Sequence, residues 1–221
     1  MMIECHAAMG ARQPLKPFRY DAEGLSPETV DVAIQHCGIC HSDIHLIDND
    51  WGITTYPLVP GHEIVGTVAA MGEGVSDFVA GQRVGIGWQR GSCLKCDYCL
   101  RGEEQLCNAN RATCVGHYGG FADAIRIDSR FVFAIPESLP SEQAAPLLCG
   151  GITVYAPLRF YGVQPPMRLG VIGIGGLGHL AIQFARAFGC EVTAFSSTRE
   201  RKVRPRTWEP TSSSGPGIVP P

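Results

Sequence analysis

A run of four cysteines constrains this chain more than any other feature of its sequence. The spacing is Cys-x2-Cys-x2-Cys-x7-Cys, and the members are Cys93, Cys96, Cys99 and Cys107. Four thiolates this close on one loop can surround Zn²⁺ completely, which is typical of a structural zinc site. Two disulfides or four unrelated thiols are alternative interpretations. A DNA-binding zinc finger is a third, but no basic helix adjoins the cluster.

Composition bears on these alternatives. The 221 residues are 45% apolar and 18% charged, which is typical of a folded chain with a hydrophobic core. The net charge of −3 argues against nucleic acid as a partner. No apolar run reaches the roughly 18 residues of a membrane span, and no signal-peptide pattern begins the chain. We therefore expect a cytoplasmic protein without membrane partners, whose reduced cysteines bind metal.

A second set of candidate ligands is dispersed along the chain. Cys40 begins Cys-His-Ser-Asp, His62 and Glu63 lie in Gly-His-Glu-Ile-Val-Gly, and Cys149 precedes two glycines. Two thiolates and an imidazole would leave a fourth position on zinc for water or substrate. Spacing alone does not bring these residues together, and a lone Cys or His is more often a core or surface residue.

Other cysteines and aromatic residues allow more than one interpretation. Cys37 and Cys40 could form a redox pair, although the thioredoxin-like context is missing. Trp51, Tyr56 and Trp88 could line a pocket for an aromatic ligand, but aromatic side chains more often belong to the core. We expect ordinary small buried residues at Cys5, Cys37, Cys114 and Cys190.

The pattern of short elements predicts two regions. Residues 1–148 are β-rich, with strands expected at 30–35, 64–68, 121–127 and 131–135, which favours a barrel or sandwich. The pattern of residues 149–200 is different and predicts a strand at 169–172, a helix at 177–188 and a strand at 191–195. That order is a β-α-β unit, and it implies a parallel sheet.

A glycine-rich turn joins the first of these strands to the helix. Gly173, Gly175 and Gly178 fit G-x-G-x-x-G in the strand-to-helix context that the dinucleotide-binding fingerprint requires. The first glycine permits the tight turn, the second lets the backbone approach a pyrophosphate, and the third lets the helix pack on the strand. Gly176 and Leu177 begin the helix, whose N-terminus would face the anion.

The residues after the strand expected at 191–195 indicate which dinucleotide the chain would bind. This position usually carries Asp or Glu in NAD-binding chains, but here Ser196, Ser197, Thr198 and Arg199 follow. Loss of the carboxylate removes repulsion toward a 2′-phosphate, and Arg adds attraction. The segment therefore favours NADP(H) over NAD. The alternative is an exposed polar turn that contacts no cofactor.

Taken in order, these motifs resemble the zinc-dependent alcohol dehydrogenases of the medium-chain dehydrogenase/reductase class. The stretches CGICHSDIH and PLLCGGITVYAPL, with the Ser-Ser-Thr-Arg segment, resemble the cinnamyl-alcohol-dehydrogenase-type branch of NADP-dependent aldehyde reductases. The resemblance spans roughly residues 15–200. It implies a GroES-like zinc-binding catalytic domain over 1–148 and a partial Rossmann domain over 149–200.

The resemblance also implies roles for individual residues. Cys40, His62 and Cys149 match the catalytic zinc ligands, and Glu63 matches the acidic residue behind the metal. Ser42 and His45 match the proton relay. The four-cysteine run matches the ligands of the family's structural zinc. Among the residues that would contact the cofactor, His41 matches a residue near the pyrophosphate and Thr153 one near the nicotinamide. The 2′-phosphate pocket is matched by Ser196, Ser197 and Arg199. The implied activity is zinc-dependent, NADP(H)-linked hydride transfer between small primary alcohols and aldehydes.

The sequence departs from the family near its C-terminus. Too few residues follow Gly170 for more than one β-α-β unit, so the second nucleotide-binding half and the dimer-forming return segment are missing. Residues 201–221 are basic and then rich in Pro and Ser, which predicts a disordered or frameshifted tail. We therefore expect a chain truncated in its cofactor domain, with impaired cofactor affinity. The rival interpretations are a non-catalytic zinc-binding module and a redox or metal sensor.

Overall fold

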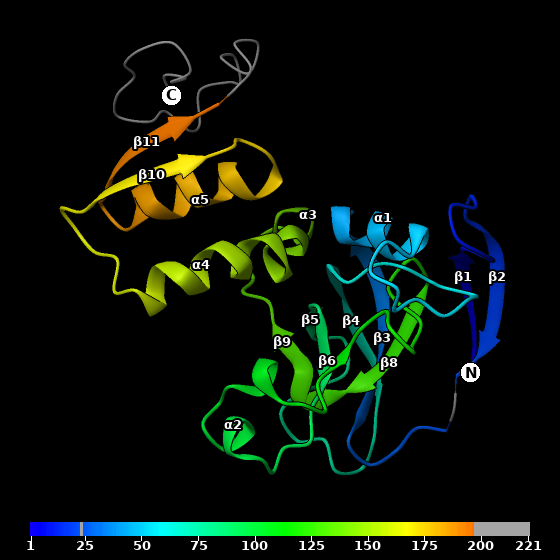
Figure 1. Ribbon diagram of the computed structural model, residues 1–221. Helices are drawn as coiled ribbons and strands as arrows, with labels where there is room; N and C mark the ends of the chain where they lie inside the picture. Colours follow the sequence, from blue (N-terminus) through cyan, green and yellow to red (C-terminus); the bar gives the residue numbers. More distant parts are fainter. Residues whose placement is uncertain (23, 197–221) are drawn as a thin grey trace. The chain divides into compact units, whose positions relative to one another are not determined.

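The computed structural model describes residues 1–22 and 24–196. The chain divides into two compact units, Met1–Cys149 and Gly150–Pro221 (Figure 1).

A five-stranded antiparallel sheet forms the centre of the first unit. Its strand order is β8-β3-β4-β5-β9, and the strands are β3 (Thr29–Cys37), β4 (Ile64–Met71), β5 (Arg83–Ile86), β8 (Ala124–Asp128) and β9 (Val132–Ala134). Their core-facing side chains are mostly β-branched, which suits a pleated, buried surface. The fully buried members include Val30, Val32, Ile64, Val84, Ile86 and Ile125.

Two smaller antiparallel pairs complete the strands of this unit. The hairpin of β1 (Met2–Ala7) and β2 (Lys16–Asp21) alternates exposed and buried residues along β1. The other pair, β6 (Gln89–Gly91) with β7 (Arg111–Ala112), encloses the four-cysteine run. That run also contains the short helices α2 (Asp97–Leu100) and η1 (Glu104–Leu106).

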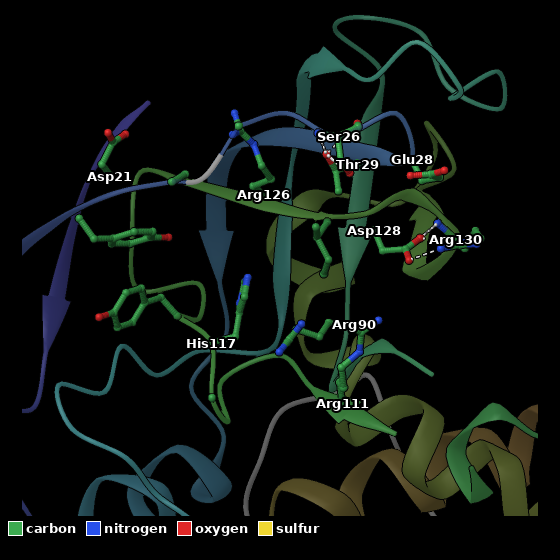
Figure 2. Close-up of a pocket in the computed structure, with 16 residues that line it drawn as sticks. Asp21, Ser26, Glu28, Thr29, Arg90, Arg111, His117, Arg126, Asp128 and Arg130 are labelled. Carbon is green, nitrogen blue, oxygen red and sulfur yellow. Dashed lines mark hydrogen bonds and ion pairs between the residues drawn. The ribbon is translucent and has the colours of Figure 1, made fainter. Parts of the chain in front are cut away.

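Short helices connect the strands. Helix α1 (His41–Asp48) begins after Cys40 and ends at Asn49, which adopts the left-handed conformation. Turn η2 (Ser129–Phe131) begins at Asp128, whose carboxylate accepts bonds from the backbone and side chain of Arg130 (Figure 2). Helix α3 (Ser141–Ala144) and η3 (Ala145–Leu148) lead to the end of the unit.

The second unit contains a β-α-β arrangement. Strand β10 (Arg168–Ile172) pairs in parallel with β11 (Glu191–Phe195), and α5 (Gly176–Ala187) connects them. Helix α4 (Gly150–Phe160) precedes them and packs on α5. The apolar core consists of Ile182 and Ala185 from α5, Cys190, and Val192 and Ala194 from β11.

Most predicted elements are observed, but one strand begins later than expected. The strand expected from Phe121 starts at Ala124. The residues before it pair with β1 instead: the N–H of His6 donates to the carbonyl of Phe121, and the N–H of Asp123 donates to that of Glu4. The tail expected at 201–221 lies outside the described residues. Within the described ranges, no helix is long and apolar enough to cross a membrane.

Candidate metal centres

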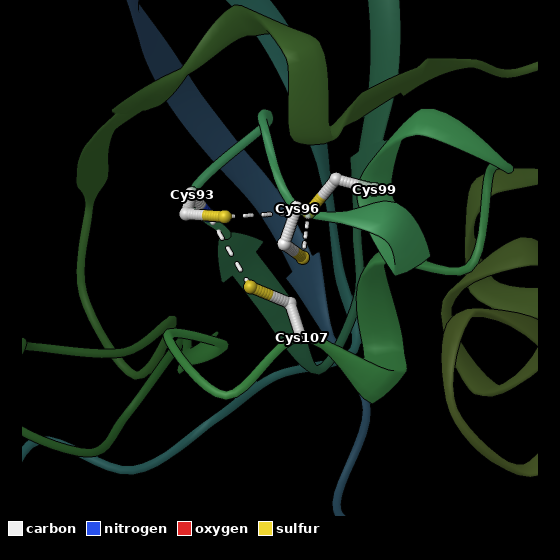
Figure 3. Close-up of side chains that lie close together, drawn as sticks. All are labelled: Cys93, Cys96, Cys99 and Cys107. Atoms are coloured by element: carbon white, nitrogen blue, oxygen red, sulfur yellow. Dashed lines mark hydrogen bonds between the residues drawn. The ribbon is translucent and has the colours of Figure 1, made fainter.

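The four cysteines of the 93–107 run converge on one point (Figure 3). All four sulfur atoms lie within 4.8 Å of one another. The Sγ atom of Cys99 lies 3.5 Å from that of Cys96 and 3.9 Å from that of Cys93. These separations are far longer than an S–S bond, and all four cysteines are free. The geometry therefore fits four thiolates around a metal ion rather than two disulfides.

Backbone amides prepare this loop for thiolates. The N–H groups of Lys95 and Cys96 donate to the sulfur of Cys93 and lower the pKa of that thiol to about 6. The sulfur of Cys107 accepts from the N–H groups of Cys93, at 3.5 Å, and Ala109, at 3.3 Å. Hydrogen bonds of this kind stabilise the charged form of a thiol, which is the form that binds metal.

The dispersed ligands also come together, all within the first unit. The ligand atoms of Cys40, His62, Glu63 and Cys149 lie within 4.8 Å of one another. Cys40 precedes α1, His62 and Glu63 precede β4, and Cys149 follows η3. The sulfur atoms of Cys40 and Cys149 are 3.9 Å apart although 109 positions separate them in sequence.

The His62 ring carries the clearest sign that a ligand belongs here. Its side chain is fully buried, and its Nδ1 atom lies 2.9 Å from Oδ1 of Asp43. The other ring nitrogen, Nε2, is buried and has no hydrogen-bond partner among the described residues. Buried polar atoms almost always have a partner. An imidazole held by a carboxylate at Nδ1, with Nε2 facing two thiols, is the usual arrangement of a zinc ligand.

Asp43 joins the two ligand-bearing segments. Its Oδ2 atom accepts from the N–H of Cys40 at 3.0 Å, and Oδ1 accepts from the N–H of Gly61 at 2.9 Å. Gly61 has a φ of 101°, which favours glycine at this turn. Burial disfavours the charged form of His62, but the Asp43 carboxylate outweighs this effect and raises the pKa of the ring. Sequence reasoning assigned no role to Asp43, although a carboxylate inside Cys-His-Ser-Asp was a visible signal.

Glycine also makes room for Glu63. A side chain at Gly38 would collide with the Glu63 carboxylate, so glycine leaves room for the carboxylate in this position. The N–H of Gly38 donates to the Glu63 carbonyl at 2.9 Å. The segment before Cys40 is thereby held against the segment that carries His62.

Helix α1 places the other predicted residues around Cys40. Burial raises the pKa of Cys40, but hydrogen bonds from the backbone and hydroxyl of Ser42 outweigh it, and the pKa is lowered. The Nδ1 atom of His45 lies 2.8 Å from Oδ2 of Asp50. The ring centroids of His41 and His45 are 4.8 Å apart.

Two tryptophans extend this set of rings. Trp88 meets the His62 ring edge-on, with centroids 4.9 Å apart, and Trp51 lies 6.2 Å from Trp88. Tyr56 does not join them in the same way: its hydroxyl donates to the carbonyl of Ile47 at 2.7 Å. A wall of aromatic side chains therefore borders the dispersed ligand cluster.

Cys114 has surroundings that the sequence did not indicate. Its sulfur lies 4.0 Å from Nδ1 of His62, and the residue is fully buried. Burial raises the pKa of this thiol. It lies on the Nδ1 side of the ring, together with Asp43, and not among the ligands of the dispersed cluster.

The glycine-rich turn lies in the second unit. Gly173 has a φ of 85°, and a side chain at Gly178 would collide with the Gly173 carbonyl. The space where side chains at Gly175 and Gly176 would stand is open. Leu177 follows in the first turn of α5, Thr153 lies in α4, and Ser196 follows β11. Ser197, Thr198 and Arg199 lie outside the described residues.

Comparison with known proteins identifies the family. Residues 26–137 match the alcohol dehydrogenase GroES-like domain. The chain therefore belongs to the alcohol dehydrogenase family that carries this domain. Its relatives place it in the cinnamyl-alcohol-dehydrogenase-like branch of the zinc-dependent medium-chain class, so the resemblance found in the sequence is confirmed.

The similar proteins are longer than this chain. The aldehyde reductase AdhA of Synechocystis is 51% identical over 202 residues, which are 91% of this chain and 60% of that protein. The structure of a cinnamyl alcohol dehydrogenase from Sorghum bicolor matches with a TM-score of 0.88 at 41% identity, over 91% of this chain and 60% of that one. The Helicobacter pylori enzyme complexed with NADP(H) also gives 0.88, at 36% identity, over 91% and 61%. The chain thus spans about 60% of the length of these relatives.

Proposed function

We propose that this chain carries the zinc and substrate site of an NADP(H)-linked oxidoreductase that interconverts primary alcohols and aldehydes. One observation carries the proposal: the buried Nε2 atom of His62, which has no hydrogen-bond partner in the described part of the chain, lies in a cluster with two thiols and a carboxylate. The similarity to an aldehyde reductase and to cinnamyl alcohol dehydrogenases supports the reaction class.

Two zinc ions fit the donor sets. A catalytic ion would be held by Cys40, His62 and Cys149. Glu63 would lie behind the metal or exchange with one of its ligands. That ion, when bound, would act as a Lewis acid on the alcohol or aldehyde oxygen. The structural ion would be held by Cys93, Cys96, Cys99 and Cys107, whose four thiols leave no position for substrate.

Side chains of this protein would transfer the proton to and from the substrate oxygen. In the reduction direction, the carbonyl carbon gains a hydride and its oxygen gains a proton. Ser42 lies beside Cys40 at the start of α1, and His45 lies one turn further along the same helix. In this direction we assign the proton path from the half-exposed His45, which Asp50 orients, through the Ser42 hydroxyl to the substrate oxygen, and the reverse path in alcohol oxidation.

The aromatic wall favours an apolar or aromatic substrate. Trp88 stands beside the His62 ring, and Trp51 continues the wall toward His45. Indole rings exclude water and stack on flat substrates. An aromatic aldehyde is therefore the substrate class to test first.

NADP(H) is the proposed cofactor. The glycine-rich turn from Gly173 to Gly178 and the N-terminus of α5 would hold the pyrophosphate, and Ser196 to Arg199 the 2′-phosphate. His41 would contact the pyrophosphate and Thr153 the nicotinamide. The neighbour complexed with NADP(H) supports this choice.

The test follows NADPH oxidation by the purified 221-residue chain with an aromatic aldehyde. Turnover that a chelator and His62→Ala both abolish would support the proposal. Folded, zinc-loaded protein without turnover would instead support the alternative, a non-catalytic zinc-binding module. Zinc released by a mild oxidant, with no turnover, would favour a metal or redox sensor.

A further inference from the structure

A second concave site lies in the first unit, and none of its lining residues belongs to the metal-ligand clusters (Figure 2). Its volume is about 640 Å³. Four arginines line it: Arg90 from β6, Arg111 from β7, Arg126 from β8 and Arg130 from η2. Four guanidinium groups in one cavity raise the question of which anions neutralise them.

Two of the four arginines are matched within the chain. Arg126 donates from Nε and Nη2 to the two carboxylate oxygens of Asp31, at 2.6 and 2.7 Å. Arg130 donates in the same way to Asp128, at 2.8 and 2.6 Å. In a bidentate ion pair of this geometry the carboxylate neutralises the guanidinium group, so neither Arg126 nor Arg130 needs a further anion.

The other two arginines have no such partner. The Nε atom of Arg90 donates to the carbonyl of Ala112 at 3.0 Å, a neutral acceptor. Neither Arg90 nor Arg111 forms an ion pair within residues 1–22 and 24–196. Among the described residues, neither guanidinium group therefore lies within ion-pair distance of a carboxylate, although Asp21, Glu28 and Asp128 also line the cavity.

The β6–β7 pair brings these two guanidinium groups together. Gly91 and Arg111 are register partners, and a side chain at Gly91 would meet the Nε and Nη2 atoms of Arg111 at 2.6 Å. The guanidinium of Arg111 thus packs against the backbone beside Arg90, and Figure 2 shows the two side chains next to each other. Burial and the charge of Arg111 together lower the pKa of Arg90. The pair is held in an unfavourable arrangement that an anion would relieve.

Aromatic residues also line the cavity. Tyr20 and Tyr118 line the same cavity, with ring centroids 4.4 Å apart. His117 also lines it, and its Nδ1 atom lies 3.1 Å from the carbonyl of Thr113. The cavity is much larger than an inorganic anion, and its aromatic lining residues suit an organic group with a flat face.

We propose that Arg90 and Arg111 form a binding site for the phosphate group of a small aromatic phosphate ester. Two guanidinium forks match the charge and the several oxygens of a phosphate dianion. The tyrosine rings would bound the organic part. The site is independent of the proposed dehydrogenase chemistry, since it shares no residue with the metal clusters or the glycine-rich turn.

The experiment titrates phenyl phosphate and inorganic phosphate into the full 221-residue chain by calorimetry. We expect saturable binding of phenyl phosphate, weakened by about tenfold or more in Arg90→Gln and in Arg111→Gln, as loss of a charged hydrogen-bond donor predicts. Arg101→Gln is the matched control, because that exposed arginine pairs with Glu103 outside the cavity. Circular dichroism checks that each variant is folded.

Arg111→Lys keeps the proposal testable if a Gln variant does not fold. It retains the charge but loses the fork, so binding should weaken less than in a folded Gln variant and more than in the control. The proposal fails if phenyl phosphate does not bind, or if binding is the same in all variants, as binding at the glycine-rich turn would give. It also fails if benzoate binds as tightly as phenyl phosphate, which would indicate a carboxylate site.

Discussion

The two metal-ligand clusters of the first unit are built in opposite ways. The four-cysteine lobe, Cys93 to Cys107, takes all its ligands from one loop, and backbone amides of that loop hold the sulfurs. The dispersed cluster takes its ligands from three distant segments, and Cys40 and Cys149 are 109 positions apart. The lobe is therefore organised by local chain geometry, whereas the dispersed cluster exists only when the whole unit has folded.

The largest effect should follow from breaking the lobe. Cys93→Ser removes one of four thiolates, and structural zinc contributes most of the folding free energy of such loops, on the order of 10 kcal/mol in isolated peptides. We expect loss of the zinc ion held by the lobe and local unfolding of residues 93–107. Zinc analysis and hydrogen exchange measure these effects. Cys190→Ser in the second unit is the control, and loss of both zinc ions from Cys93→Ser would show that the clusters are not independent.

Removing the imidazole should have a narrower effect. His62→Ala deletes the ligand whose Nε2 atom has no other partner among the described residues. We expect the dispersed cluster to lose its zinc while the lobe keeps its own, because the two clusters share no ligand. Thermal unfolding with metal analysis tests this. Retention of both ions by a folded variant would contradict the assignment of His62.

Much of this comparison could be predicted from the sequence, and the reason is locality. The four-cysteine lobe could be predicted from the spacing of its cysteines. The expected bounds of the strands and helix in the β-α-β unit also agree closely with those observed, because Gly189, with a φ of 79°, follows the end of the helix as expected. The family resemblance also predicted that the dispersed cysteines and His62 are zinc ligands, and their ligand atoms lie close together. Spacing alone would not have grouped them.

The missed features depend on tertiary contacts or on atypical local signals. Helix α4 contains Pro157, which disfavours a helix interior, and α1 begins after a cysteine, which is not a usual N-cap residue. The bonds from Asp43 to both ligand segments connect residues that only the fold brings together, and so does the pairing of Gly91 with Arg111, which places Arg111 near Arg90. No periodicity in the sequence reports such contacts.

A smaller change should weaken the dispersed cluster without abolishing it. Asp43→Asn keeps the shape of the side chain but removes the charge that holds His62 at Nδ1. Partners of this kind change metal affinity by about 10- to 100-fold. Competition with a zinc chelator measures the change, with Asp48→Asn on the same helix as the control. Equal zinc affinity in both variants would exclude Asp43 as the positioning residue.

The smallest effect concerns acid pH and should leave both clusters unchanged. Burial raises the pKa of Asp128, but the bonds from Arg130 outweigh it, so the pKa lies below its ordinary 3.8. The pair therefore stabilises the fold above that pH, and the contribution disappears as pH falls through the lowered value. For a half-exposed pair the effect is under about 1 kcal/mol. The difference in free energy of unfolding between wild type and Asp128→Asn, measured with urea, should be smaller at pH 3 than at pH 6.

Zinc stoichiometry tests the central claim most directly. Native mass spectrometry of the zinc-loaded chain, of Cys93→Ser and of His62→Ala counts the ions that each one holds. The account predicts two zinc ions in the wild-type chain and one in each variant, with Cys93→Ser keeping the ion of the dispersed cluster and His62→Ala keeping that of the lobe. A wild-type chain that holds one ion, lost in Cys93→Ser and retained in His62→Ala, would contradict it.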